Sequence, residues 1–323
     1  MARRVYAAVV KALGQVPRCE LIDLPSPTSN QVEVQVIAAG VHQLVRAIIG
    51  GRHYIKPKTS PIVAGVDGVG KLSNGEKIFF ISMAPPTGTM SEHVNVHRDM
   101  MIPLPNNADP ILFAAIMNAG MASWMALRQR ARIQPGETVL ILGVTGSSGQ
   151  IAASTARLLG AKHVIGVGRN TSILDQLLSD GKIDASIPLT NDEEQIQQAI
   201  AKEAAGVDIV LDFLWGRPTE IAMAGIQSAR KDPAQRLRWV EIGQMAGPTI
   251  QCSAMFLRSK NIEIMGSGIG PISLTEMLKD LEHMVPLVME GKLTTSVITI
   301  PLKDIETKWE ETANAKERVV VVM

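Results

Sequence analysis

The stretch Val139-Leu-Ile-Leu-Gly-Val-Thr-Gly-Ser-Ser-Gly-Gln-Ile-Ala152 decides the fold of this chain. An apolar run, typical of a buried strand, stops at a loop with glycines at 143, 146 and 149, and a helix of small residues follows. A turn without Cβ atoms brings the backbone close to a pyrophosphate, and the N–H groups at the start of a helix bind its charge. No lysine follows the loop, as a P-loop requires. The stretch therefore predicts a dinucleotide site.

The composition narrows the class of protein. The 323 residues suffice for two domains, and 46% of them are hydrophobic, so we expect a sizeable core. A net charge of +1 and an aromatic content of 3% argue against a nucleic-acid partner, which needs a basic face and stacking platforms. Two cysteines, Cys19 and Cys252, form neither a disulfide framework nor a four-cysteine zinc site.

The N-terminus carries no sign of export. Its first residues, Met-Ala-Arg-Arg-Val-Tyr, lack the apolar core of a signal peptide. No uninterrupted apolar run reaches the ~18 residues that a membrane span needs. We therefore expect a soluble cytoplasmic protein without a membrane partner.

The pattern of elements changes along the chain. The first hundred residues read as short strands between turns, such as Val5–Val10, the alternating segment Gln31–Ala38 and Lys77–Ile81. Residues 109–132 have a helical pattern, with Asp109 as the cap. Strands and helices then alternate, which predicts a parallel sheet covered on both faces. The predicted strands are 138–142, 163–167, 183–187, 207–211, 237–242 and 262–265, and the helices are 147–160, 171–180, 192–204 and 217–229. Strand character returns at 296–302 and 318–322.

The glycine loop departs from the strict G-x-G-x-x-G spacing because Val144 occupies the position of the first glycine; Gly143, Gly146 and Gly149 form a G-x-x-G-x-x-G variant instead. Its context still fits, since a strand precedes it and a helix follows. An alternative interpretation is that the glycines only allow close packing of helix and strand. The residues that we expect at the cofactor phosphates are Thr145, Gly146, Ser147, Ser148 and Gly149.

The end of the second strand of this alternating region distinguishes NAD from NADP. An NAD site usually has Asp or Glu about 20 residues past the glycines, where it binds the ribose hydroxyls. Here the strand ends in Gly168-Arg169-Asn170, without a carboxylate. The guanidinium of Arg169 suits a 2′-phosphate, and Asn170 can add hydrogen bonds. We therefore predict NADPH as the cofactor; the alternative is that Arg169 is a solvated loop residue.

Three further strand ends should surround the cofactor, because ligands of such sheets bind at the carboxyl ends of the strands. Each of these ends carries glycine, which permits close approach, although ordinary turn chemistry also explains it. The residues that we expect there are Phe213 and Leu214, Ile242 and Gly243, and Gly266 and Ser267.

Several motifs together resemble one family. They are Gly65-Val-Asp-Gly-Val-Gly70, Gly120-Met-Ala-Ser-Trp124, Gly146-Ser-Ser-Gly149, Asp208-Ile-Val-Leu-Asp212 and Ile262-Glu-Ile-Met-Gly-Ser267. Their order is similar to that in the medium-chain dehydrogenase/reductase superfamily, in its zinc-independent quinone oxidoreductase-like branch. The resemblance implies an α/β fold: a GroES-like β-barrel catalytic domain at 1–114 and 286–323, and a doubly wound Rossmann domain that binds NADPH at 115–285. It also implies a homodimer or tetramer paired through the edge strand near Ile262–Met265.

Zinc-dependent relatives carry a cysteine near residue 42, a Gly-His-Glu motif and a four-cysteine lobe. Here His42 stands near the first position, Val66-Asp67 replaces His-Glu, and no cysteine lies between Cys19 and Cys252. A catalytic zinc needs three protein ligands and an open position, which His42 and Asp67 do not supply. His93 and His97 lie on a predicted strand, about 13 Å apart, too far for one zinc. We predict no metal.

Without zinc, hydride transfer needs hydrogen-bond donors that stabilise the developing oxyanion. The resemblance implies Tyr54, offset by one residue from the family's tyrosine, and His42, where relatives usually carry Asn, as the catalytic candidates. His42 polarises the acceptor carbonyl or holds the nicotinamide ribose. The usual acid three residues on is Val45 here. For both residues, simple packing is the alternative.

We therefore predict an NADPH-dependent oxidoreductase that reduces quinones or α,β-unsaturated carbonyl compounds (enones) by direct hydride transfer. Reduction of a polarised C=C bond leaves an enolate that hydrogen bonds hold. The alternatives are an NADPH-binding sensor or structural protein with little turnover, and a zinc-free alcohol dehydrogenase. The substrate is not readable from the loops around 42–58, 83–90 and 244–258.

Overall fold

A computed structural model describes residues 3–55, 57–83, 86–190 and 192–323. The chain forms two compact units: Met1–Ala119 with Leu274–Met323, and Gly120–Ser273. The sequence analysis placed these boundaries at 114/115 and 285/286. The difference lies in two helices, since α2 (Pro110–Met125) runs across the first boundary and α8 (Leu274–Leu281) belongs to the N-terminal unit.

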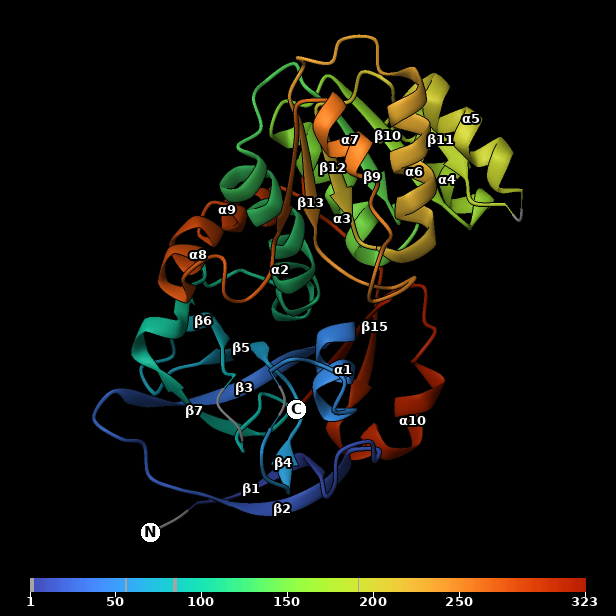
Figure 1. Cartoon of the computed structure of the whole chain (residues 1–323). Helices are drawn as coiled ribbons and strands as arrows, with labels where there is room; N and C mark the ends of the chain where they lie inside the picture. The colour runs from blue at the N-terminus through green and yellow to red at the C-terminus, as the bar shows by residue number, and fades with distance from the viewer. Residues whose placement is uncertain (1–2, 56, 84–85, 191) are drawn as a thin grey trace. The chain divides into compact units, whose positions relative to one another are not determined.

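The second unit is built on a six-stranded parallel sheet in the order β11-β10-β9-β12-β13-β14 (Figure 1). This is the doubly wound strand order 3-2-1-4-5-6, which reverses direction between β9 and β12. The predicted α/β class and parallel sheet are confirmed. The strands are β9 Thr138–Leu142, β10 His163–Gly168, β11 Ala185–Pro188, β12 Ile209–Asp212, β13 Leu237–Glu241 and β14 Ile262–Gly266.

Helices cover both faces of this sheet, because its strands carry apolar side chains on both sides. One core joins Val139 and Ile141 to helices α3 and α4, and the other joins Leu140 and Leu142 to α5, α6 and α7. The near-continuous apolar runs that predicted the strands are therefore buried on two faces. The helices are α3 Ser147–Leu158, α4 Thr171–Ser179, α5 Glu193–Glu203, α6 Gly216–Ala229 and α7 Ala254–Ser259.

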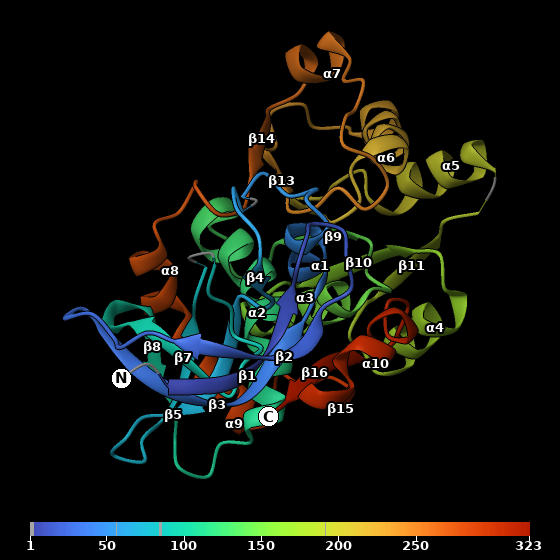
Figure 2. The ribbon, with the colours of Figure 1, turned by 90° about the horizontal axis from the view of Figure 1, so that it is seen from below.

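The N-terminal unit contains two sheets. Strands β2-β1-β4 form the first, and β15-β16-β3-β5-β6-β8 with β7 on β3 form the second (Figure 2). Strand β16 pairs antiparallel with β3, so the end of the chain completes the sheet of the N-terminal unit. The strands are β1 Arg3–Val10, β2 Arg18–Leu24, β3 Gln31–Val41, β4 Ile62–Val63, β5 Asp67–Lys71, β6 Lys77–Ile81, β7 His93–His97, β8 Met101–Pro103, β15 Val297–Pro301 and β16 Arg318–Val322.

Short helices join these strands. Helix α1 (Gln43–Ile49) buries Val45, Ile48 and Ile49 against the core of the unit, and Trp309 of α10 (Ile305–Glu311) packs into the same core. Helix α9 spans Met284–Met289, and 3₁₀ turns lie at Arg98–Met100 (η1) and Leu302–Asp304 (η3).

The helical pattern of residues 109–132 is confirmed. The Asp109 carboxylate accepts a hydrogen bond from the N–H of Ile111 at 2.9 Å, and α2 continues as a π-helix, η2, over Ala126–Ala131. By length and composition Pro110–Ala131 is apolar enough to cross a membrane, with a mean hydropathy of 1.5. Because 67% of this window is buried, it serves as a core helix.

Asp212, the last residue of β12, holds the loop that follows it. Its buried carboxylate accepts hydrogen bonds from the N–H groups of Leu214 and Trp215, both at 2.9 Å. The hydroxyl of Thr219 and the indole N–H of Trp239 donate to its other oxygen, at 2.6 and 3.0 Å. Burial raises the pKa of Asp212, and these four donors oppose that shift. They also hold Trp215 at a φ of 52°, a backbone conformation that residues other than glycine rarely adopt.

Replacing this carboxylate should destabilise the second unit. In Asp212→Asn the amide NH₂ faces donors that need an acceptor, so we expect a loss of about 2–4 kcal/mol in the free energy of unfolding. Chemical denaturation measures it. Asp232→Asn is the matched control, because that exposed carboxylate accepts only a local bond from Ala234 N–H at 2.9 Å. Equal stability of Asp212→Asn and wild type contradicts this account of the loop.

Candidate functional site

The glycine loop joins β9 to α3 at the point where the strand order of the sheet reverses. Gly143 has a φ of +94°, and its N–H and that of Val144 donate to the Val167 carbonyl of β10, at 2.9 and 3.0 Å. A Cβ on Gly149 would overlap the Gly143 carbonyl oxygen, so the first turn of α3 rests directly on the loop backbone. The spacing of these glycines is thus a packing requirement.

Gly146, in contrast, is not needed for packing. A Cβ there would have only the Gly143 carbonyl oxygen nearby, at 3.5 Å, so packing does not demand glycine. Gly146 is also exposed and stands at the N-cap of the twelve-residue helix α3. Bare backbone at the positive end of a helix, with space in front of it, suits a bound pyrophosphate.

The end of β10 lies beside this loop. A Cβ on Gly168 would overlap the side chain of Thr145, so the two predicted residues are in contact range. Arg169 follows and is exposed. The Asn170 side chain accepts a hydrogen bond from Ile173 N–H at 3.2 Å and caps α4, which leaves its amide NH₂ for other partners. The structure therefore brings Gly168 and Arg169 to the glycine loop and gives Asn170 a capping role that the sequence analysis missed.

The loops after β12 and β13 join the same edge. A Cβ on Gly143 would lie 3.1 Å from Leu214, and one on Gly243 would lie 3.2 Å from the Phe213 carbonyl oxygen. The N–H groups of Ile242 and Gly243 donate to the Asp212 carbonyl at 2.8 and 3.2 Å. The predicted residues of β9, β12 and β13 therefore form one continuous set of loops.

The end of β14 extends this set. Ser267 N–H donates to the Glu241 carbonyl at 2.7 Å, and the Arg130 guanidinium donates to the Gly266 carbonyl at 2.9 Å. Burial raises the pKa of Glu241, and the nearby Asp212 raises it further. Glu241 and Asp212 are acidic groups at strand ends to which the sequence analysis gave no role.

The two candidate catalytic residues lie in the N-terminal unit in different environments. Tyr54 is 69% exposed, and its ring lies 4.1 Å from that of His53, centroid to centroid. His42 is 6% exposed, and its Nε2 lies 2.6 Å from Oδ1 of Asp67, which is fully buried. Arg318 is buried near Asp67. The sequence analysis considered Asp67 only as a zinc ligand and gave Arg318 no role; their grouping with His42 depends on strand pairing.

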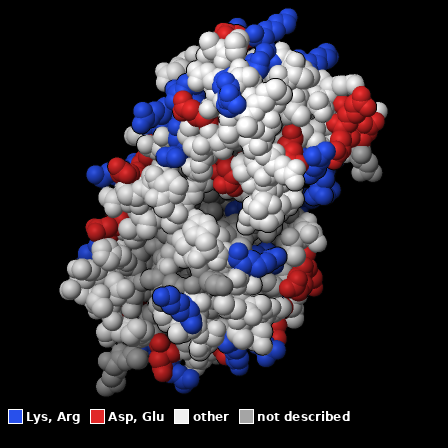
Figure 3. All heavy atoms as spheres, viewed as in Figure 1, with Lys and Arg blue, Asp and Glu red and all other residues white. Residues whose placement is uncertain are grey.

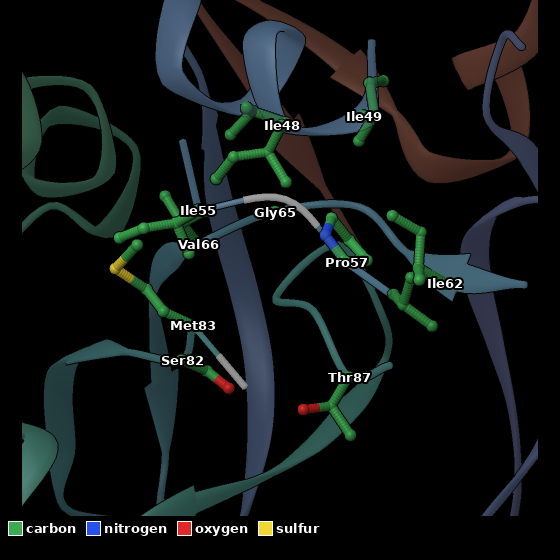
Figure 4. A pocket seen from close by; sticks show the side chains of 12 residues that line it. Ile48, Ile49, Ile55, Pro57, Ile62, Gly65, Val66, Ser82, Met83 and Thr87 are labelled. Atoms are coloured by element: carbon green, nitrogen blue, oxygen red, sulfur yellow. The ribbon is translucent and has the colours of Figure 1, made fainter. Parts of the chain in front are cut away.

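An apolar pocket lies in the same unit (Figure 4). It is partly open to solvent, and Ile48 and Ile49 of α1 line one side of it. Ser82 and Thr87 contribute hydroxyl groups to the lining, and Met83 contributes a thioether. Among the other methionines, Met90 and Met117 are fully buried in the core and Met245 is 65% exposed.

Within the described residues, no three His, Cys, Asp or Glu side chains are grouped so that they could hold a metal ion. His93 and His97 lie on strand β7, as predicted, and each has an acidic neighbour, Glu33 at 2.9 Å and Asp99 at 3.5 Å.

On the face drawn in Figure 3, basic and acidic side chains are interspersed.

No protein-family model matches the chain. It is 28% identical to the probable NADPH-dependent quinone reductase tdiC of Emericella nidulans, in an alignment covering 94% of this chain and 95% of that protein. It is 27% identical to the quinone oxidoreductase of Sus scrofa over 60% of each chain. Among solved structures, the Thermus thermophilus quinone oxidoreductase superposes with a TM-score of 0.77 at 23% identity, over 99% of this chain and 100% of that one.

The superposition covers both units, so the α/β fold is that of a Rossmann domain with a GroES-like β domain. The full-length similarity to tdiC agrees with the motif order and the strand order of the sheet. The chain is thus similar in sequence, over nearly its whole length, to a quinone reductase, and it has the fold of the quinone oxidoreductases, as the motif order of the medium-chain dehydrogenase/reductase superfamily predicts.

Proposed function

We propose that this protein is an NADPH-dependent oxidoreductase that reduces quinones or enones by direct hydride transfer, without a metal. The observation that carries the proposal is the continuous edge formed by the glycine loop, Gly168 and Arg169. The relatives named as quinone reductases support the reaction class.

The cofactor, when bound, supplies a hydride from its dihydronicotinamide ring. The backbone at Gly146 and the first turn of α3 would hold its pyrophosphate, with the Ser147 and Ser148 hydroxyls and Thr145 alongside. Arg169 would pair with the 2′-phosphate, for which its exposed guanidinium is suited. The loops that carry Phe213, Ile242 and Gly266 would line the remainder of the cofactor.

His42 is proposed to donate a hydrogen bond to the acceptor carbonyl, and the Tyr54 hydroxyl is a second donor. Such donors stabilise the oxyanion that forms as hydride arrives. The described residues provide no three-ligand metal group to act in their place.

Steady-state turnover tests this proposal directly. Oxidation of NADPH should accelerate on addition of a quinone or an enone, and prior treatment with a chelator should leave that rate unchanged, because no step uses a metal. Absorbance at the dihydronicotinamide band measures it, with an unactivated ketone as the control acceptor. Tight NADPH binding without transfer to any acceptor contradicts the proposal and supports a sensor. Loss of turnover on chelation contradicts the metal-free step.

Cofactor choice should depend on Arg169. In Arg169→Ala the 2′-phosphate loses a charged partner, so the preference for NADPH over NADH should fall about 10- to 100-fold, the equivalent of about 1.5–3 kcal/mol. Dissociation constants from fluorescence titration measure it.

Two variants make this test specific. Gly146→Ala should weaken both cofactors alike, because the pyrophosphate is common to them. Arg236→Ala should change neither constant, because Arg236 pairs with Glu263 at the opposite, amino end of β13. If the ratio of the dissociation constants for NADPH and NADH is unchanged in Arg169→Ala, this residue does not bind the 2′-phosphate.

We also propose that the protein is cytoplasmic and forms a homodimer through β14. This strand is last in its sheet, so one edge of it lacks a neighbouring strand, and Ile264 on it is 38% exposed. An apolar edge of this kind invites pairing with a second copy. Ile264→Lys should therefore give a monomer in light scattering, while the exposed Leu21→Lys leaves the mass unchanged. A monomeric wild type, or a dimeric Ile264→Lys, rules out this interface.

A further inference from the structure

Three buried polar groups meet at one end of the larger sheet of the N-terminal unit. His42 follows β3, Asp67 begins β5 and Arg318 begins β16. The pairs Val41–Val319 and Ala39–Gly68 fix the register, so His42 and Arg318 lie one position beyond the first pair, and Asp67 one position beyond the second. Strand pairing therefore brings together residues from three distant parts of the chain.

Each of these side chains has a polar atom without a partner in the structure. They are Nδ1 of His42, Oδ2 of Asp67 and one terminal nitrogen of Arg318. All three residues are less than 9% exposed. Leaving a buried polar atom unpaired costs about 1–3 kcal/mol, so three in one place indicate a functional constraint rather than a packing choice.

Arg318 lies near the Asp67 carboxylate and is anchored elsewhere. Its Nε donates to the Ala115 carbonyl at 3.1 Å, which anchors the guanidinium. Burial lowers the pKa of Arg318, and the nearby Asp67 carboxylate opposes that shift. Asp67 is therefore in direct contact with the His42 imidazole and has the Arg318 guanidinium nearby.

Asp67 in turn determines how His42 presents its ring. An ionised carboxylate only accepts, so the 2.6 Å contact requires a hydrogen on Nε2 of His42. The second nitrogen, Nδ1, is buried and is then the ring nitrogen that has no partner within the protein. Helix α2 contributes uncharged carbonyls, such as Ala114, near Gly40. The one charged side chain of α1, Arg46, turns instead to Trp309 and Thr312, so Asp67 and Arg318 are the charges that face His42.

We propose that Asp67 and Arg318 are positioning residues that make His42 the proton donor to the acceptor. This rests on the proposed function above. Hydride adds two electrons to the enone β-carbon or the quinone, and the C=C or C=O electron pair moves to oxygen, which becomes anionic. The Nδ1–H of the imidazolium then transfers its proton to that oxygen, His42 becomes neutral, and solvent reprotonates it after product leaves. Asp67 balances the charge of the imidazolium throughout.

The test uses the full chain and three variants. Asp67→Asn should lower kcat about 100-fold or more, with little change in KM for NADPH. Because Asp67→Asn disturbs a buried pair, His42→Asn provides a second variant. Its amide can donate a hydrogen bond but cannot transfer a proton, so its kcat should also be low.

Glu33→Gln is the matched control. Glu33 pairs with His93 at 2.9 Å on the same sheet but in a more exposed setting, and its loss should leave kcat unchanged. Imidazole ¹⁵N NMR of the protein without acceptor gives a readout apart from activity. Wild-type His42, assigned by its absence in His42→Asn, should show a hydrogen fixed on Nε2 at high pH, and Asp67→Asn should show a mixture of tautomers.

The outcomes separate the two proposals. If the wild-type protein reduces no acceptor, the proposed function is wrong, and so is this inference. Unchanged kcat in Asp67→Asn, or full activity in His42→Asn, overturns the role of His42 as proton donor but leaves the proposed function standing. A wild-type tautomer with its hydrogen on Nδ1 overturns the positioning role of Asp67.

Discussion

The contact of Gly149 with the carbonyl of Gly143 is the constraint on which the second unit depends. No side chain fits between them, so α3 begins directly on the loop that ends β9. That contact sets the direction in which the helix N-terminus points. It also leaves Gly146, the one glycine of the loop that packing does not require, in open space. Two further glycines of this edge are equally close to their neighbours. Gly168 has no space for a Cβ beside Thr145, and Gly143 has little space beside Leu214. The edge of the sheet is thus assembled by backbone proximity, which is what a charged ligand with little tolerance for bulk requires.

The acidic residue Asp212 shows how the loops at that edge are kept in place. This one carboxylate accepts hydrogen bonds from two backbone N–H groups, a hydroxyl and an indole. It thereby links β12, the loop after it, α6 and β13. The group formed by His42, Asp67 and Arg318 in the N-terminal unit differs from Asp212, because each of its side chains has a buried polar atom without a hydrogen-bond partner. A satisfied network stabilises a fold, whereas an unsatisfied one leaves bonding capacity for another molecule. The difference separates a structural carboxylate from one that we assign to chemistry.

Local patterns predicted most of the elements. The strands at 138–142 and 262–265 and the helices at 147–160 and 171–180 were predicted within a few residues, because alternation and apolar runs are properties of neighbouring residues. Glycine spacing located the loop, and Arg169 was placed correctly at the end of β10. The helix cap formed by Asn170 was missed, since a side chain that can bond a ligand can equally bond the next helix. The buried acids at 67 and 212 were also underestimated, because a carboxylate in a sequence is ordinarily a surface residue.

The sequence by itself therefore determined the order of the strands and helices, the glycine loop and the absence of the cysteines of a zinc lobe. These are short-range or compositional properties, and they carry their meaning without a fold. Only the tertiary structure decided that His42 has Asp67 and Arg318 as neighbours, that Tyr54 is exposed, and that α8 joins the N-terminal unit. The pairing of β3 with β5 and with β16 joins residues that are far apart in the chain, and it depends on register rather than on any local pattern.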